Sequence, residues 1–383
     1  MLDRSIFKSI TETLEKYPIV ALTGPRQSGK TTLLRTKFDH YRYVSLENPD
    51  VRSYAEEDTK GFLDEYSYRV IFDEVQRVPK IFSYLQGIVD KSQVMGQFIL
   101  SGSQSFNLIE NITQSLAGRV ALFSLFPFDM EEMERAQWLS DDLGEVFSKG
   151  FYPAIFEREI NQDRYYSDYL NTYVKRDVSQ LVNIQNYGAF VRFIKICATR
   201  AGQILNLNNL ARDAGVSHTT ARNWLSILET SYIVFLLQPY FRNYSKRIVK
   251  SSKLYFYDTG LLCHLLDFRK GRISPVNQVW GNVFENMIVG ELEKQNYHQN
   301  LHRNYWFWRD SHSHEIDLLY SDGHSLSTYE IKSSTTIGSK MFEGLKYFKA
   351  ISDDPISKQT LIYGGKEDQK RTDYKVLSWN NTN

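Results

Sequence analysis

The chain has 383 residues, of which 42% are hydrophobic and 24% charged, and its formal net charge is +1. At about 100 to 200 residues per domain this length exceeds one ordinary hydrophobic core, so we expect two or three domains, and the motifs below favour three. No stretch approaches the roughly 18 unbroken apolar residues of a spanning helix, which excludes an integral membrane protein of that kind. The near-neutral charge excludes no class of ligand, because binding depends on local patches.

The N-terminal residues and the cysteines predict a cytoplasmic protein. Residues 1–8 alternate charged with apolar side chains and do not build the apolar block of a signal peptide. Cys197 and Cys263 are the only cysteines and form no Cys-x-x-Cys pair. We therefore expect a cytoplasmic, reduced compartment, two small buried thiols and no metal knuckle.

The first predicted strand covers residues 17–23, ends at Gly24 and is followed by a helix from Thr31 onward. The motif Gly-x-x-x-x-Gly-Lys-Thr stands between them. In such a loop, glycines let backbone N–H groups converge on phosphate oxygens, and the next helix aims its positive end at the same place. Lys30 is expected to meet the outer phosphates and Thr31 to ligate Mg²⁺. The predicted ATP site comprises Gly24, Pro25, Arg26, Gln27, Ser28, Gly29, Lys30, Thr31 and Thr32.

Further strands are expected over residues 41–46, 69–72, 97–101 and 120–125, with a helix between 79 and 89. Strands that alternate with helices predict a parallel, doubly wound α/β sheet. Asp73 and Glu74 follow the apolar strand that comes about 40 residues after the loop. We expect Asp73 to hold the Mg²⁺ shell and Glu74 to orient or deprotonate the attacking water, the alternative being an exposed acidic turn.

The polar run after the fourth strand, Ser101-Gly102-Ser103-Gln104, is a candidate contact to the γ-phosphate. Ser103 and Gln104 are the better candidates within it. A simple loop remains the alternative.

Residues 129–185 show helical spacing of apolar side chains, which suggests a helical lid or bridge. Residues 207–228 then give a helix, a turn with Gly215 and a second helix, and a strand is expected over 232–240. This order is typical of a winged helix, a DNA-binding fold that also serves as a protein contact or spacer.

The predicted second helix offers hydrogen-bonding groups to a major groove, and a basic segment follows it. We expect this segment, residues 242–253, to lie along a phosphate backbone, because it contains no acidic residue. The candidate DNA contacts are His218, Thr219, Arg222, Asn223, Lys246, Arg247 and Lys250.

The last domain follows a linker over residues 268–277 and begins with a helix over 280–294. Strands are expected over 304–308, 315–320, 327–332 and 360–363. His312 and His314 form a His-x-His pair, which we interpret as a solvated turn because no third ligand stands at metal spacing.

Three acidic residues and a lysine in this domain stand at a suggestive spacing. Glu330 and Lys332 share one face of a strand, and Asp317 on the neighbouring strand can approach the same point. With Glu285 on the preceding helix, these carboxylates would bind Mg²⁺ while Lys332 positions or activates water. The arrangement resembles the PD-(D/E)xK nuclease fold, although Ile316 stands where that fold has proline. Charges on an exposed sheet are the alternative.

The motifs together resemble the bacterial and archaeal ATPases of the AAA_14 type that carry a C-terminal domain called DUF4143. The resemblance rests on residues 24–32, 72–76 and 100–104 and extends to segments 115–119, 150–153, 173–177 and 257–261. It implies that Arg119 stabilises charge in the transition state, in cis or from a neighbouring subunit. A surface ion pair is the alternative for this arginine.

These inferences define the expected architecture and function. We expect an AAA-like P-loop core over residues 1–128, a helical lid over 129–185, a winged helix over 186–267 and a nuclease-like α/β domain over 279–383. The predicted function is a Mg²⁺-dependent ATPase that binds and processes nucleic acid, with a nuclease site and a possible homo-oligomeric state. The alternative is an ATP-controlled switch whose nuclease-like domain is a non-catalytic module that binds DNA or protein.

Overall fold

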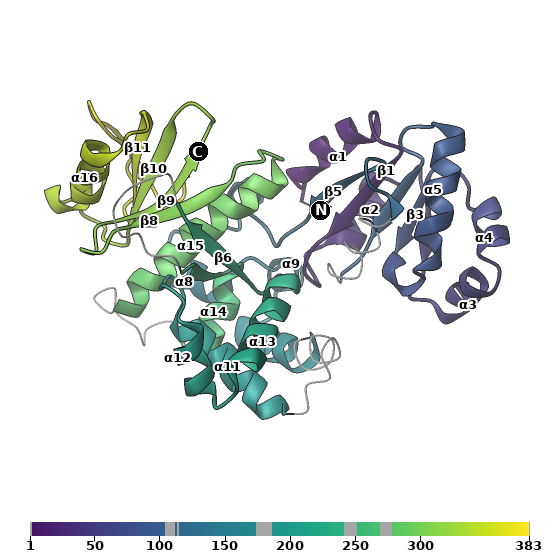
Figure 1. Cartoon of the computed structure of the whole chain (residues 1–383), viewed down its shortest axis with the longest axis horizontal. Helices are drawn as coiled ribbons and strands as arrows, with labels where there is room; N and C mark the ends of the chain where they lie inside the picture. The colour runs from purple at the N-terminus through teal and green to yellow at the C-terminus, as the bar shows by residue number, and fades with distance from the viewer. Residues whose placement is uncertain are drawn as a thin grey trace.

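A five-stranded parallel sheet forms the N-terminal part of the computed structural model, which describes residues 2–103, 112, 115–173, 186–240, 251–268 and 278–382 (Figure 1). Its order is β2-β3-β4-β1-β5. β4 therefore lies between β1, which precedes the glycine-rich loop, and β3, which ends at Asp73. The predicted parallel sheet is confirmed. The strands are β1 (Ile19–Thr23), β2 (Arg42–Ser45), β3 (Val70–Asp73), β4 (Phe98–Ser101) and β5 (Val120–Ser124).

Helices cover both faces of this sheet. Val20 and Leu22 point to one face and Ile19 and Ala21 to the other, because successive side chains of a strand alternate. The first face packs against α1 (Ile6–Leu14) and α2 (Lys30–Lys37). The second packs against α3 (Pro49–Glu57), α4 (Thr59–Glu65) and α5 (Lys80–Ser92).

The middle of the chain is mostly helical and contains the expected pair of helices. Gly215, with φ of 71°, ends the first of them, and the Ser217 side chain caps the second by accepting from the Thr220 N–H. Two antiparallel strands follow. The elements are α7 (Met130–Arg135), α8 (Leu143–Lys149), α9 (Pro153–Glu157), α10 (Gln162–Tyr169), α11 (Tyr187–Thr199), α12 (Leu207–Ala214), α13 (His218–Thr230), α14 (Thr259–Leu265), β6 (Val234–Pro239) and β7 (Lys253–Phe256).

An eight-stranded mixed sheet dominates the C-terminal part, in the order β12-β13-β11-β10-β9-β8-β6-β7. The sheet crosses the expected linker, because Gln238 of β6 pairs in parallel with Trp306 of β8. Local sequence patterns did not indicate this long-range pairing. The further elements are α15 (Gln278–His298), β8 (Tyr305–Arg309), β9 (Glu315–Ser321), β10 (Leu326–Lys332), α16 (Glu343–Ile351), β11 (Ile356–Tyr363), β12 (Gln369–Lys370) and β13 (Lys375–Ser378).

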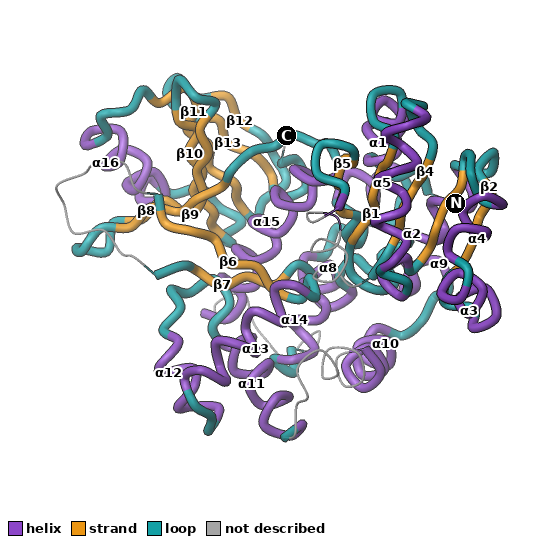
Figure 2. Tube along the Cα trace, turned by 45° about the vertical axis from the view of Figure 1, so that its right-hand side comes forward, coloured by secondary structure: helices purple, strands orange, loops and turns teal. Residues whose placement is uncertain are grey.

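The long helix α15 connects the two sheets. Figures 1 and 2 show it in the centre of the molecule, between the N-terminal sheet and the C-terminal one. It packs against β5 and α1 on one side and against β7 and β10 on the other. Its buried residues lie on all sides of the helix, as expected for a helix enclosed by protein.

Within the described part of the chain, no helix combines the length and apolarity needed to cross a bilayer.

Candidate functional site

The loop after β1 adopts a backbone that requires glycine at two positions. Gly24 has φ of 136°, and a Cβ atom there would lie 2.2 Å from the Leu125 carbonyl oxygen. Gly29 has φ of 96° and directly precedes α2. Both conformations lie in the region that L side chains avoid. The loop therefore turns tightly between strand and helix, as a phosphate-binding loop does.

Lys30 is held inside this loop. Its side chain is 7% exposed, and its Nζ donates to the carbonyl oxygens of Gly24 and Pro25, each at 2.8 Å. Burial lowers the pKa of Lys30 to about 8, although the Glu74 and Asp73 carboxylates oppose that shift. The ammonium is thus poised beside the place that a phosphate would take.

Asp73 lies at the end of β3 and accepts hydrogen bonds from three hydroxyl groups. The Thr31 Oγ1 donates to its Oδ2 at 3.2 Å, and the Tyr43 and Ser101 hydroxyls make short hydrogen bonds to the same carboxylate. Burial, and then the bond to Asp73, raise the pKa of Tyr43. Three donors fix the orientation of the carboxylate.

Glu74 stands next to it in a left-handed conformation, with φ of 54°. Such a backbone is unfavourable for a residue with a side chain, so the surrounding contacts must hold Glu74 in it. Its Oε2 accepts from Gln76 Nε2 at 2.5 Å and from Ser103 Oγ at 3.2 Å. The structure thus brings Ser103 to Glu74, whereas Gln104 lies outside the described residues.

A pocket of about 400 Å³ opens over the loop. Most of the predicted nucleotide-site residues line it, together with side chains from the N-terminus and from α9. Its lining includes Arg4, Arg26, Gln27, Gly29, Lys30, Thr31, Thr32, Lys37, Glu47, Glu74, Ser103, Pro153, Glu157 and Arg158. Gly24, Pro25 and Ser28 form the loop behind this surface.

A magnesium ion fits the donor set on this side of the molecule. The Thr31 hydroxyl and the Asp73 carboxylate are within hydrogen-bonding distance of each other and offer hard oxygen ligands. Mg²⁺ prefers such oxygens, completed by water and phosphate. Thr31 and Asp73 are therefore the residues that would hold it.

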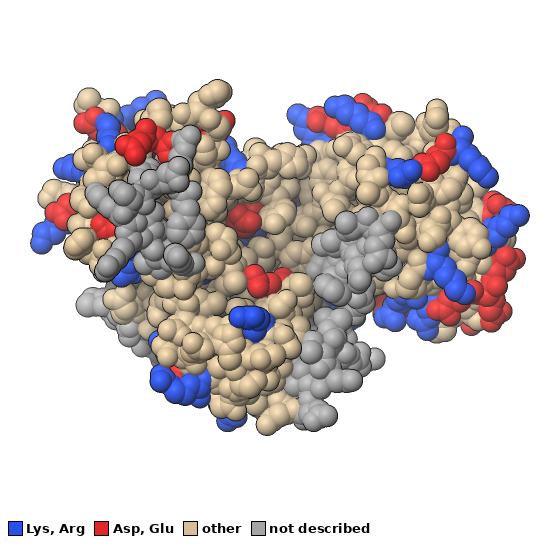
Figure 3. All heavy atoms as spheres, in the orientation of Figure 1, with Lys and Arg blue, Asp and Glu red and all other residues tan. Residues whose placement is uncertain are grey.

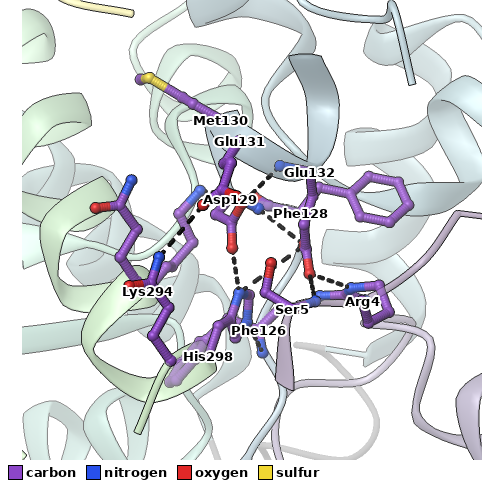
Figure 4. Close-up of polar contacts among 12 residues, drawn as sticks. Arg4, Ser5, Phe126, Phe128, Asp129, Met130, Glu131, Glu132, Lys294 and His298 are labelled. Carbon is purple, nitrogen blue, oxygen red and sulfur yellow. Dashed lines mark hydrogen bonds and ion pairs between the residues drawn. The ribbon is translucent and has the colours of Figure 1, made fainter. Parts of the chain in front are cut away.

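Arg4 braces the loop, which no sequence motif indicated. Its guanidinium is buried and donates to the Ser28 carbonyl at 2.8 Å and the Phe126 carbonyl at 2.7 Å. It also donates to the Glu132 carboxylate at 3.0 Å (Figure 4). A rigid, planar fork of donors suits three acceptors at once. Arg4 thus connects the loop to the segment that follows β5.

The same network continues to α15. Asp129 and Glu132 form a capping box at the start of α7, and the Asp129 Oδ2 lies 2.7 Å from the His298 Nδ1 (Figure 4). The Phe126 N–H donates to His298 Nε2, so the ring proton sits on Nδ1 and is donated to Asp129. Burial alone would raise the pKa of Asp129, but the His298 hydrogen bond lowers it to about 2. Both ring nitrogens of His298 are used, which leaves none for a metal ion.

Arg158 and Arg119 differ in their relation to the pocket. Arg158, at the end of α9, lines it and was not predicted. Arg119 directly precedes Val120, and Val120 pairs with Ile19, the first residue of β1. The loop follows the other end of β1, about 13 Å from Ile19 at about 3.3 Å per residue. The Arg119 guanidinium forms an ion pair with Asp90 at 2.5 Å. A role in cis does not fit this placement, and a role in a neighbouring subunit stays a prediction.

The C-terminal constellation converges as the spacing indicated. Lys332 Nζ lies 3.3 Å from the Asp317 carboxylate and 2.5 Å from that of Glu330, and Asp317 also accepts from the Ile331 N–H at 2.7 Å. Burial, and then the Asp317 charge, raise the pKa of Glu330 to about 8. Glu285 and Asp317 form one group with a further carboxylate, that of Glu315. One carboxylate oxygen of each residue lies within 4.8 Å of those of the other two.

Magnesium does not fit this second group as the structure has it. The Lys253 ammonium lies 2.9 Å from Glu285 and in short contact with Glu315. We expected residues 242–253, which include Lys253, to lie along a phosphate backbone. For Lys253 that prediction is wrong, because its side chain is 2% exposed. His314 pairs with Asp310 at 2.9 Å and is partly exposed beside the exposed His312, as expected of a turn.

The α13 helix presents the predicted polar face to solvent. His218, Thr219, Arg222 and Asn223 are exposed, whereas Ala221 and Trp224 are buried. Lys246, Arg247 and Lys250 lie outside the described residues. On the face drawn in Figure 3, basic and acidic side chains are interspersed over both ends of the molecule.

Three family models match consecutive parts of the chain. They are an AAA domain, AAA_14, over residues 16–134, a domain of unknown function, DUF8612, over 140–272, and a domain of unknown function, DUF4143, over 280–381. Solved structures that align with the chain include a Walker-type ATPase of Pyrococcus abyssi, at 15% identity over 69% of this chain and 96% of that one, with a TM-score of 0.46. RuvB of Thermotoga maritima aligns at 20% identity over 60% of this chain and 88% of that one, with a TM-score of 0.31.

Among curated proteins, two uncharacterized proteins from Mycobacterium tuberculosis and Mycobacterium bovis are each 31% identical to the chain over 332 residues. The alignments cover 85% of this chain and 73% of each relative. The chain therefore belongs to the same family as these mycobacterial proteins, and its N-terminal domain is an AAA-type P-loop ATPase domain.

Proposed function

We propose that this protein hydrolyses ATP at the pocket over the P-loop and uses the nucleotide state as a switch. The observation that carries the proposal is that Lys30, Thr31 and Glu74 line one pocket, with the Asp73 carboxylate hydrogen-bonded to Thr31. Lys30 exchanges its two carbonyl partners for phosphate oxygens. Glu74, held by Gln76 and Ser103, orients the attacking water and accepts its proton. Bound Mg²⁺ would neutralise charge on the phosphates.

Hydrolysis is tested with the full chain, ATP and Mg²⁺. Lys30→Ala is expected to abolish ATP binding, whereas Glu74→Gln should bind ATP and lose hydrolysis by about 100-fold or more, as for a lost general base. Lys16→Ala, an exposed lysine on the same domain, is the matched control. Unchanged turnover in Glu74→Gln would show that another group serves as the base.

The switch part of the proposal rests on the network from the P-loop to α15. Arg4 touches the Ser28 carbonyl, and Glu132 and Asp129 continue the contact to His298. A change in the loop on nucleotide binding or release can therefore be transmitted to the helix that joins the two sheets. The coupling exists only if these contacts differ between the nucleotide-bound and the nucleotide-free loop.

We further propose that α12 and α13 with β6 and β7 form a winged helix that contacts DNA. The exposed polar face of α13 favours this candidate. Binding of a fluorescent duplex at low and moderate salt tests it, with Arg222→Ala expected to weaken binding and Arg192→Ala, whose side chain bonds the Ala214 carbonyl, expected to act only through stability. Absence of duplex binding at low salt would favour a protein partner.

For the C-terminal part we propose a nuclease-like fold that binds and does not cut. Its order of α15, β8, β9, β10, α16 and β11 and the meeting of Asp317, Glu330 and Lys332 support the likeness. The ammonium groups of Lys253 and Lys332 form ion pairs with its carboxylates, which favours a non-catalytic module.

A further inference from the structure

The carboxylate cluster of the C-terminal domain already contains a cation, and it comes from another part of the chain. Lys253 begins β7, within the segment matched by DUF8612, whereas Glu285, Glu315 and Asp317 lie in the segment matched by DUF4143. β7 reaches the cluster because it pairs with β6, and β6 joins the edge of the C-terminal sheet at β8. The two domains therefore complete this site together.

The Lys253 ammonium occupies the position that a metal ion would take among these carboxylates. It lies 2.9 Å from Glu285 Oε1 and in short contact with Glu315 Oε1, and the three carboxylates place their oxygens within 4.8 Å of one another. Its side chain is 2% exposed, so the ammonium lies inside the cluster and not in water. Tyr255 supports the arrangement by donating its hydroxyl to Glu285 at 2.7 Å.

Two further cations offset most of the remaining negative charge of the cluster. Arg309 pairs with the second oxygen of Glu315 at 3.0 Å, and Lys332 lies between Asp317 and Glu330. Four carboxylates thus face three permanent cations without any metal. A divalent ion placed beside Lys253 would meet its charge at short range in a buried environment, where repulsion is strong.

The cluster is nevertheless shaped like a ligand site. Glu330 is 7% exposed and its Oε2 is buried without a hydrogen-bond partner. A cavity of about 620 Å³, lined by Gly202, Gln278, Lys253, Glu285 and Glu315 among others, reaches the cluster from solvent. An ion of suitable charge could therefore enter if the ammonium were absent.

We propose that Lys253 is the resident cation of this cluster and that it excludes divalent metal ions, so that the C-terminal domain holds a latent metal site that its neighbouring domain keeps closed. The inference deepens the proposed non-catalytic module and is independent of ATP hydrolysis. It predicts that removal of one positive charge, rather than addition of a ligand, creates a metal site.

The test counts Mn²⁺ bound to the full chain by electron paramagnetic resonance in an Asp73→Asn background, which removes the ligand of the nucleotide site. The chain with Lys253 is expected to bind no Mn²⁺ at this cluster. Lys253→Met should gain one Mn²⁺ per chain, and adding Glu285→Gln should abolish the gain. Lys253→Arg is the control that keeps the charge and should bind none.

Lys253→Met leaves buried carboxylates without their cation and is expected to lower stability, so thermal unfolding with and without Mn²⁺ is the second readout. Mn²⁺ should raise the Tm of Lys253→Met and not that of Lys253→Arg. Mn²⁺ bound by the chain with Lys253 and lost in Asp317→Asn would overturn the proposal. So would a folded Lys253→Met protein that gains no site. Turnover of ATP, measured on the chain with native Asp73, separates these outcomes from failure of the proposed hydrolysis.

Discussion

Lys30 carries a buried ammonium group, whose hydrogen-bond acceptors among the described residues are two carbonyl oxygens. Its burial determines how its charge responds to pH. Because burial lowers its pKa to about 8, the free protein loses this charge as the pH rises from 7 to 9. A phosphate group brought beside Lys30 favours the charged form and raises its pKa again. ATP binding is therefore coupled to proton uptake.

We expect the ATP affinity to fall by up to about fivefold between pH 8 and pH 9, because a group with a pKa of about 8 is about half protonated at pH 8 and about one tenth protonated at pH 9. Calorimetry in buffers of different ionisation enthalpy should detect close to half a proton taken up per ATP bound at pH 8. Lys30→Arg keeps its charge and should show neither effect. An affinity that is flat to pH 9 in the native protein would contradict the assignment.

Arg4 is the second residue whose contacts predict a measurable effect. Its removal would leave Glu132 buried without a counter-charge, at a cost of about 3 to 5 kcal/mol, so Arg4→Lys is the more informative change. Lysine keeps the charge and cannot reach Ser28, Phe126 and Glu132 together. We expect KM for ATP to rise about tenfold, the equivalent of one charge-assisted hydrogen bond, with a small change in Tm.

The matched control for Arg4→Lys is Arg135→Lys, because Arg135 is exposed and contacts the same N-terminal segment through Ser5. If both variants change KM equally, Arg4 acts only as part of the fold and does not position the loop.

At the scale of helices and strands, local sequence patterns predicted an element correctly where the residues that define it are neighbours in the sequence. β1 is an unbroken run of buried residues from Ile19 to Thr23, and the loop after it follows from Gly24, Gly29 and Lys30. The α12–α13 pair was predictable because Gly215 and Ser217 are a C-terminal and an N-terminal cap.

β7 was not predictable from its own residues. Lys253 ends a basic stretch of the sequence, which favours an exposed position for its side chain. β7 is nevertheless buried along its whole length. Its partners Glu285 and Glu315 lie more than 30 residues away, and only the fold brings them together. For the same reason Arg4, Tyr43 and Arg158 carried no signal, because each reaches the nucleotide pocket or Asp73 from a distant element.

The capping of α13 gives a prediction for this element. The Ser217 side chain accepts from the Thr220 N–H at 3.1 Å, and Ser217→Ala should lower the free energy of unfolding by about 1 kcal/mol. Urea denaturation measures this change, and Ser217→Asp, which also caps, should restore it. A loss larger than about 2 kcal/mol would mean that Ser217 has a further role in packing or binding.

At the scale of the whole molecule, α15 determines whether the two sheets respond to each other. It contacts β5 and α1 of the N-terminal domain and β7 and β10 of the C-terminal sheet. Lys294 donates to the Phe128 carbonyl at 2.7 Å, and Glu291 accepts from the Met130 N–H at 2.8 Å, so the segment after β5 is attached to this helix at several points. Its enclosure between the sheets makes it the natural route for a nucleotide-dependent change.

The central claim is that the nucleotide at the P-loop alters the contacts of α15, and amide hydrogen exchange measures this most directly. The experiment compares Glu74→Gln with ATP and with ADP, and follows peptides that cover residues 291–298. We predict a difference in protection between the two nucleotides in this segment, which Arg4→Lys reduces and Arg135→Lys leaves unchanged. Identical exchange of residues 291–298 in the ATP and ADP states, with both nucleotides bound, would contradict the account.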